Sequence, residues 1–429
     1  MEVESVVGAN SNSNALLDDD GKARRTGTVW SASAHIITAV IGAGVLSLAW
    51  AMAQLGWILG TASILIFAGV TLFTSNLLAD CYRSPHPVTG KRNHTYMEAV
   101  KAHLGGRMHM ICGLIQYSNL VGIAIGYTIT TSISVVTIVK NNCMKKHNGS
   151  EADCHFSNNP SIIGIAIAEI FLSQIPNFHK LSWISFLAAI MSFGYAFIGI
   201  GLSLTVIIQA FLILDSLKST PAENKVMKMA NSIGIITMSI IFLLSGGAGY
   251  AAFGADTPGS ILNTTGNEHV WLVYMGNVFI IVHILGAYQV LIQPFYHIVE
   301  LLVSQRWASS NFINKEYFVG IGKIQFSINL FRLIWRTIFV VVASVLAMAM
   351  PFFNDMLALL GAIGFWPLAV YFPIQMIIVK RNIRKGTMPW IGLQSLSLVC
   401  MIVSIAAACA AIHGLGQALG KYKPFMYKA

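Results

Sequence analysis

The sequence predicts an all-α integral membrane protein built from about ten or eleven transmembrane helices. The first observation is composition: 55% of the 429 residues are hydrophobic and only 10% are charged, whereas a soluble protein carries about 25% charged residues. The second is the recurrence of long apolar stretches, since a spanning helix needs about 17–25 such residues. They are too long and too continuous for barrel strands. Ten are present, at 33–55, 57–79, 109–139, 161–176, 181–214, 232–253, 271–303, 331–350, 356–379 and 389–416.

The stretches define one transmembrane domain, residues 33–416, in a lipid bilayer. It lies between an N-terminal tail, 1–32, and a short C-terminal tail, 417–429. No cleavable signal peptide is visible. The net charge of +10 suggests nucleic acid, but no compact basic domain is present. Excess Lys and Arg in a membrane protein typically lie in cytoplasmic loops, so we expect no nucleic-acid partner.

The positions of Lys and Arg predict the orientation, because cytoplasmic loops are enriched in them. The loop 80–108 carries five, which places it and the N-terminal tail in the cytoplasm. The loop 140–160 then lies outside, with a glycosylation sequon at Asn148. Cys143 and Cys154 bracket that loop, and an oxidising compartment permits a disulfide between them. The cysteines show no metal-binding spacing, so we expect neither a metal nor a cofactor.

Stretch 181–214 decides the number of crossings. As one straight helix its 34 residues would be about 51 Å long, against a hydrocarbon core of about 30 Å. It either crosses once with a long overhang or folds into a helical hairpin near Gly199 and Gly201. Only the hairpin keeps the later basic loops inside and puts the sequon at Asn263 outside. We therefore predict the hairpin, eleven crossings and an external C-terminus.

The first stretch carries a candidate binding element. Gly42 and Gly44 straddle Ala43 in the middle of a spanning segment. Small residues there allow close packing against a neighbouring helix. Alternatively, the helix unwinds at this point, and free backbone N–H groups hold a carboxylate at mid-membrane. The local pattern leaves both possibilities open.

Ionisable and polar side chains inside the spans are further candidates. Histidine side chains in general titrate near neutral pH, so His35 and His283 could relay a proton, or they could be structural histidines with hydrogen-bond partners. For Glu169 we expect a structural partner or an interfacial position. Tyr117 and Asn119 could line a polar cavity or bond between helices. The segment from Gly361 to Pro373 holds two glycines and two prolines, which suits a gate.

No nucleotide-binding loop, nucleophile elbow, zinc-protease motif or redox motif is present. We therefore expect a transporter or a receptor and not an enzyme.

Taken together, several stretches resemble plant amino acid permeases of the amino acid/auxin permease family. The resemblance covers nearly the whole chain, and its stretches are 25–28, 35–57, 175–183, 221–225, 283–294 and 365–373. It implies a leucine-transporter-like bundle of two inverted five-helix repeats plus one helix. It also implies proton-coupled import of neutral and some acidic amino acids across the plasma membrane.

The resemblance assigns roles to several of these residues. The substrate's carboxylate and amine should lie at the break formed by Ile41, Gly42, Ala43, Gly44, Val45 and Leu46. Tyr117, Asn119 and Phe365 should face the same cavity. His35 and His283 match histidines that the family retains in its first and eighth helices.

One departure concerns the sixth helix of the family. Family members carry several tens of further residues between the helix that starts at Leu181 and the segment from Asp215. Here the segment Leu204–Leu214 stands in their place. The resemblance therefore implies a site that lacks part of one wall. We expect weak or absent transport, and the alternative function is an amino acid sensor that does not transport.

Overall fold

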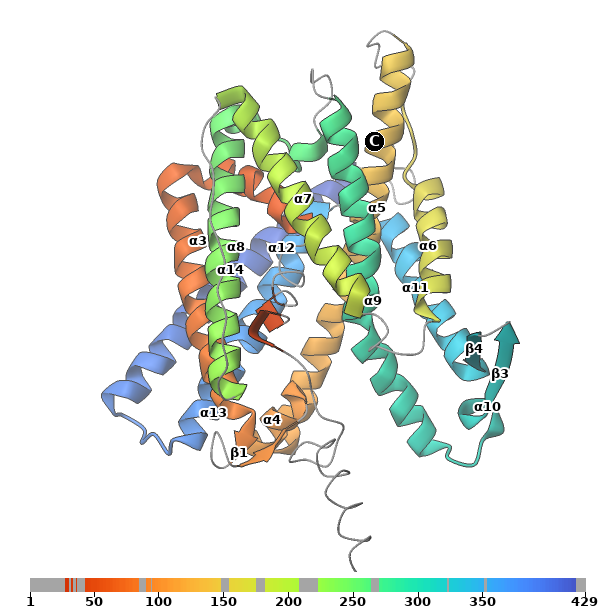
Figure 1. Ribbon diagram of the computed structural model, residues 1–429. Helices are drawn as coiled ribbons and strands as arrows, with labels where there is room; N and C mark the ends of the chain where they lie inside the picture. Colours follow the sequence, from red (N-terminus) through yellow and green to blue (C-terminus); the bar gives the residue numbers. More distant parts are fainter. Residues whose placement is uncertain are drawn as a thin grey trace, which may run out of the picture.

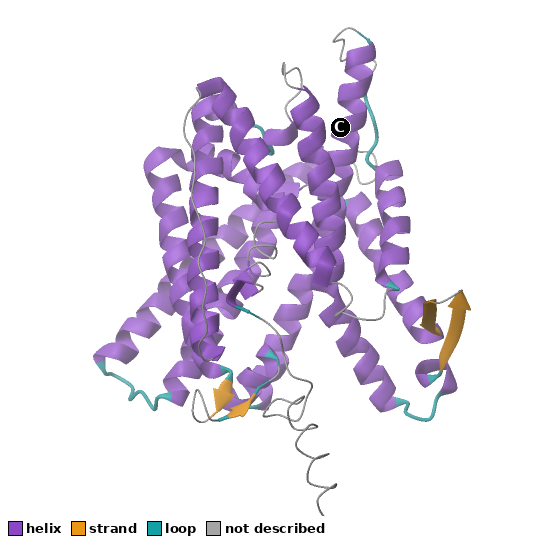
Figure 2. Ribbon diagram, in the orientation of Figure 1, coloured by secondary structure: helices purple, strands orange, loops and turns teal. Residues whose placement is uncertain are grey.

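The computed structural model describes residues 28–421 except 31, 34–35, 37–42, 85–89, 94, 148–153, 175–181, 208–222, 264–269, 322–323 and 351–352. The described part is mostly helical (Figure 2). Two short antiparallel hairpins also form. Arg83–Ser84 (β1) pairs with Lys91–Arg92 (β2), and Glu316–Ile321 (β3) pairs with Ile324–Asn329 (β4).

Long helices make up most of the bundle in Figure 1. They are α3 (Leu48–Cys81), α5 (Gly106–Lys146), α7 (Ser182–Ile207), α8 (Glu223–Phe253), α9 (Val270–Arg306), α11 (Leu330–Ala349) and α14 (Met388–Lys421). Shorter elements are η1 (Ala43–Ser47), α4 (Tyr96–Leu104), α6 (Asn159–Ser173), η3 (Gly254–Asp256), η4 (Ile261–Asn263), α10 (Asn311–Asn314), α12 (Phe353–Gly364), the π-helix η5 (Phe365–Tyr371) and α13 (Phe372–Lys380). Within the described residues, seven helical segments are long and apolar enough to cross a membrane. The protein is therefore an all-α integral membrane protein.

The bundle has two ends, which we name the Asp80 end and the disulfide end. At the Asp80 end, α4 contacts the end of α3, where His103 Nε2 lies 3.1 Å from the Cys81 carbonyl oxygen. Helix α5 starts there, and its 41 residues rise about 60 Å to the other end. At that end Cys143 is joined to Cys154 by a disulfide.

A cluster of charged side chains connects three helices at the Asp80 end. The Asp80 carboxylate accepts from Lys228 at 2.8 Å and from Arg381 at 3.4 Å. Lys380 donates to the backbone carbonyls of Asp80 and Arg83. The ends of α3 and α13 and the start of α8 are thereby held side by side.

The first two apolar stretches meet at Gly56. Its φ of 73° and ψ of 174° kink the helix inside α3. A left-handed φ is accessible to glycine at little cost because glycine has no Cβ. Gly56 therefore separates a short segment after η1 from the long spanning segment that ends at Cys81.

The predicted hairpin at Gly199 and Gly201 is wrong. Helix α7 continues unbroken through both glycines. Ile198 and Ile200 are only 8% and 6% exposed, and α7 packs against α8 and α9. Burial of Ile198 and Ile200 against the neighbouring helices therefore outweighs the small free-energy cost of glycine in a helix. Leu204–Ile207, expected to belong to helix six, form the last turn of α7, and 208–214 lie outside the described residues.

Helices α7 and α8 run in the same direction. Ser192 on α7 contacts His283 on α9. Ile198, later on α7, contacts Gly276, which is earlier on α9. Helix α7 is therefore antiparallel to α9. Helix α8 starts beside Asp80 at Lys228 and leads through η3 and η4 into α9. Both α7 and α8 therefore run from the Asp80 end to the disulfide end, where Asn263 closes η4.

Residues 208–222 join the end of α7 to the start of α8 and lie outside the described residues. Fifteen residues in an α-helix rise about 23 Å, which is less than the hydrocarbon core of about 30 Å. The connection is therefore too short to contain a complete spanning helix.

The π-helix η5 has a cause in the sequence. Phe372 N–H bonds to the Pro367 carbonyl five residues back. The next donor in that pattern would be residue 373, which is a proline and has no N–H. The Leu368 carbonyl consequently lacks its helical partner, and the Tyr96 hydroxyl of α4 donates to it at 2.7 Å. A side chain from another helix thus completes the wide turn.

Candidate functional site

The backbone leaves α-helical geometry at the start of the first long helix. Residues Ala43–Ser47 form the 3₁₀ turn η1, which leads into α3. A Cβ added at Gly44 would meet no heavy atom within 4 Å. Close packing, the alternative that the sequence left open, is therefore not the role of Gly44 among the described residues. Ile41 and Gly42 lie outside the described residues, and the side chains of Ala43 and Leu46 are also not described.

Val45 anchors this turn in the bundle. Its side chain is 1% exposed and packs in a cluster with Tyr195 and Met238. Its carbonyl accepts a hydrogen bond of 3.2 Å from the hydroxyl of Ser245 on α8. Helix α8 therefore holds the turn in place and leaves the Gly44 side open.

His283 is fully buried in the middle of α9. Its Nδ1 lies 2.9 Å from the Ala188 carbonyl oxygen and 2.8 Å from the Ser192 hydroxyl. Since a carbonyl only accepts, this arrangement favours the tautomer with the proton on Nδ1. Nε2 is then a free acceptor, and it has no hydrogen-bond partner among the described residues. His35, the other histidine candidate, lies outside the described residues.

Three other expected site residues pack against different partners. The Tyr117 ring lies 5.8 Å from the ring of Phe295 on α9. Asn119 fills the space above Gly364, where a Cβ would collide with its amide. The Phe365 ring meets Phe67 edge-on at 5.3 Å. Within the described residues, the structure does not gather these side chains around one cavity with Gly44.

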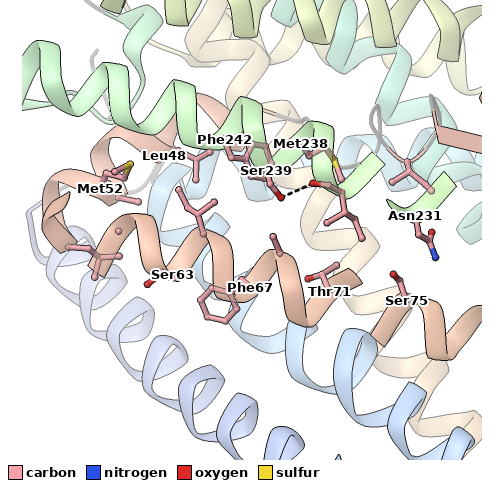
Figure 3. A pocket seen from close by; sticks show the side chains of 17 residues that line it. Leu48, Met52, Ser63, Phe67, Thr71, Ser75, Asn231, Met238, Ser239 and Phe242 are labelled. Atoms are coloured by element: carbon pink, nitrogen blue, oxygen red, sulfur yellow. Dashed lines mark hydrogen bonds between the residues drawn. The ribbon is translucent and has the colours of Figure 1, made fainter. Parts of the chain in front are cut away.

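A cavity of about 450 Å³ lies between α3 and α8 (Figure 3). Its lining is mainly apolar, and no charged side chain of the described residues belongs to it. The hydroxyl of Ser239 on its wall is already bonded to the Ile235 carbonyl at 2.7 Å. An amino acid carries a carboxylate and an ammonium group, which need polar partners when buried. This cavity therefore does not suit the substrate head group.

A buried polar cluster between α6, α9 and α11 was largely missed from the sequence. Glu169 is 2% exposed and accepts a hydrogen bond from the Gln289 amide. One turn further along α6, the Ser173 carbonyl accepts from Arg336, which also forms a bidentate pair with Glu300 at 2.7 and 3.2 Å. The sequence feature that could have predicted this cluster is Arg336, which lies inside the apolar stretch 331–350. A charged side chain in a membrane span needs a partner.

The disulfide between Cys143 and Cys154 lies at the disulfide end of the bundle. The Cα atoms of Cys143 and Cys154 are 5.9 Å apart across their disulfide. Asn148 lies outside the described residues, and only the backbone of Asn263 is described.

Sequence comparison decides the family. The chain matches the family described as "Transmembrane amino acid transporter protein" over residues 25–211 and 203–416. It belongs to this family. Among its relatives, amino acid permease 6 of Arabidopsis thaliana is 49% identical, over 96% of this chain and 95% of the relative. Amino acid permease 1 of the same plant is 47% identical, over 95% and 93%. The chain is therefore a transporter-family protein and not an enzyme.

Solved structures of low sequence identity also match. A Na⁺-coupled sialic acid symporter in a substrate-bound outward-open state gives a TM-score of 0.46 at 10% identity, covering 89% of this chain and 90% of that one. A manganese transporter from Eremococcus coleocola gives 0.41 at 10% identity, covering 91% and 95%.

The permease relatives contain residues that this chain lacks. The alignment to permease 6 has 461 positions, whereas 96% of 429 residues is about 412, which leaves about 49 positions without a residue in this chain. The family match is also split in two at 203–211. The split of the family match places the unmatched positions near the connection between α7 and α8.

Proposed function

We propose that this chain is a proton-coupled symporter that imports neutral and some acidic amino acids across the plasma membrane. Its N-terminal tail would then lie in the cytoplasm, and the Asp80 end would be the cytoplasmic end. Family membership supports amino acid transport. The observation that carries the site is the 3₁₀ turn at Ala43–Ser47 with an open side at Gly44.

The proposed chemistry follows from the ends of helices. The first N–H groups of a helical segment have no intrahelical acceptor and carry partial positive charge. At the start of the helical segment that runs from Ala43 into α3, they would hold the substrate carboxylate. The free Nε2 of His283 would accept the coupled proton, with His35 as a second candidate. Tyr117, Asn119 and Phe365 would approach the substrate after a rearrangement of α5 and η5.

Uptake into proteoliposomes tests this proposal. A labelled neutral amino acid should accumulate when the outside is acidic, and a protonophore should abolish the accumulation. Amino acid permease 6, reconstituted at equal density, serves as the reference. Accumulation that ignores the pH gradient would refute proton coupling.

The short connection between α7 and α8 favours a second candidate, a shortened relative that binds amino acids and signals without transporting them. Alternating access in such transporters moves paired repeats around a midplane site. The fifteen residues 208–222 are too few for a complete spanning helix. One of the two repeats that would have to move is therefore incomplete. Binding at Gly44 requires only η1 and its neighbours.

A chimera separates the two candidates. The permease 6 residues that this chain lacks are inserted between Ile207 and Glu223. For the second candidate, the natural chain binds an amino acid in equilibrium dialysis but does not accumulate it, and the chimera gains accumulation. Equal accumulation by the natural chain and the chimera would rule the second candidate out.

A further inference from the structure

We propose that the carboxyl group of Glu169 is a proton-binding site within the membrane, distinct from the two histidines. The inference rests on the proposed proton coupling for its role in transport, but not for the protonation itself. Its basis is the set of groups that surround this side chain on α6.

The first argument is burial without a counter-ion. Glu169 is 2% exposed, and it has a structural partner, which was one of the two positions expected for it from the sequence. Its hydrogen-bond partner is the neutral amide of Gln289, and it forms no ion pair within the described residues. An ionised carboxylate in such a place is very costly, and a protonated one is not.

The second argument is the contrast with Glu300. That carboxylate receives Arg336 at 2.7 Å and Arg332 at 3.7 Å. Arg336 also donates to the Ser173 carbonyl and lies 5.0 Å from the Tyr296 ring centre. The positive charge that is available in the cluster therefore neutralises Glu300, and none remains for Glu169. Two carboxyl groups in different surroundings take different protonation states.

The third argument is the set of buried polar atoms around Glu169. The hydroxyl groups of Tyr288 and Tyr296 interact with each other. The Oε1 atom of Gln289 is buried and has no hydrogen-bond partner among the described residues. Tyr288 and Tyr296 pack with Ala166 and Ile170, which flank Glu169 on α6. These atoms can donate to and accept from a carboxyl group that gains or loses a proton.

The elements packed on α6 contribute few other titratable groups. Helices α5, α9 and α11 contact it. From α9 the cluster receives Tyr288 and Tyr296, and from α11 it receives Arg336. The α5 residues in the same hydrophobic cluster are apolar apart from Tyr127.

A route toward the Asp80 end is also present. The pair Arg336–Glu300 continues to Arg332, and Arg332 lies 3.4 Å from Glu316, whose side chain is 41% exposed. A polar cavity of about 170 Å³, lined by Glu300, Glu316 and Arg332, opens beside them. Water in this cavity would exchange protons with the cluster from the cytoplasmic side.

Infrared spectroscopy of the full chain in nanodiscs tests the protonation directly. A protonated carboxylic acid has a carbonyl band separate from carboxylate bands. At neutral pH, where exposed carboxyl groups are ionised, the wild-type chain should show this band and Glu169→Gln should lack it. The control Glu316→Gln, at the exposed end of the route, should retain it. No wild-type band, or a band that survives in Glu169→Gln, would overturn the proposal.

Two further measurements keep the result decisive. If Glu169→Gln does not fold, Gln289→Leu removes the donor instead, and the band should persist and move to higher frequency. An unmoved band would overturn the assignment. If the band behaves as expected but uptake ignores the pH gradient, the proton site stands and the proposed coupling fails.

Discussion

The hydrogen bond from Tyr96 to the Leu368 carbonyl predicts a measurable cost for removing one hydroxyl group. Tyr96→Phe keeps the ring, whose centre lies 6.4 Å from that of Phe372, and deletes the 2.7 Å bond. The carbonyl then has no donor, because residue 373 is proline. A lost bond that strands a buried partner costs about 1–3 kcal/mol. We expect the free energy of unfolding in mixed micelles to fall by that amount.

The matched control is Tyr274→Phe. The Tyr274 hydroxyl is buried but has no hydrogen-bond partner among the described residues. Its deletion removes no hydrogen bond among the described residues, so the free energy of unfolding should not fall. If the two variants fall within error of each other, Tyr96 does not complete the π-helix and the reasoning fails. Trypsin accessibility near Arg381 and Arg384 should rise only in Tyr96→Phe, because α13 follows the π-helix directly.

Four further predictions concern other parts of the chain. Unreduced peptide mass spectra should show Cys143 bonded to Cys154, a closure worth about 3 kcal/mol; two free thiols would contradict this. A single cysteine at position 263 should react with an impermeant reagent in intact cells, and reaction only after permeabilisation would reverse the orientation. Gly44→Val should abolish amino acid binding, because its side chain would occupy the open space proposed for the substrate carboxylate. The same change at exposed Gly69, where an added Cβ also meets no heavy atom within 4 Å, should not abolish binding. Equal binding by both variants would remove Gly44 from the site. Burial and the charge of Lys380 lower the pKa of His103, although its bond to the Cys81 carbonyl opposes them. The unfolded chain therefore binds more protons below about pH 6.5, and stability should fall on acidification. His103→Gln should flatten that slope, and an unchanged slope would contradict the assignment.

Several features of this protein were predictable from the sequence. Composition and the apolar stretches were sufficient to predict a helical membrane protein, because the bilayer imposes length and polarity on each span independently of its neighbours. The family was also predictable, since several local motifs carry the resemblance. The pairing of Cys143 with Cys154 needed only two cysteines eleven positions apart.

The tertiary structure decided features that depend on residues far apart in the chain. Gly199 and Gly201 stay helical because α8 and α9 bury their neighbours, which local glycine content could not indicate. The donor to the Leu368 carbonyl is 272 residues away, and the partner of Glu169 is 120 residues away. Whether a glycine bends a helix, or a buried acid meets a charge, depends on which helices pack together, and packing is a property of the whole bundle.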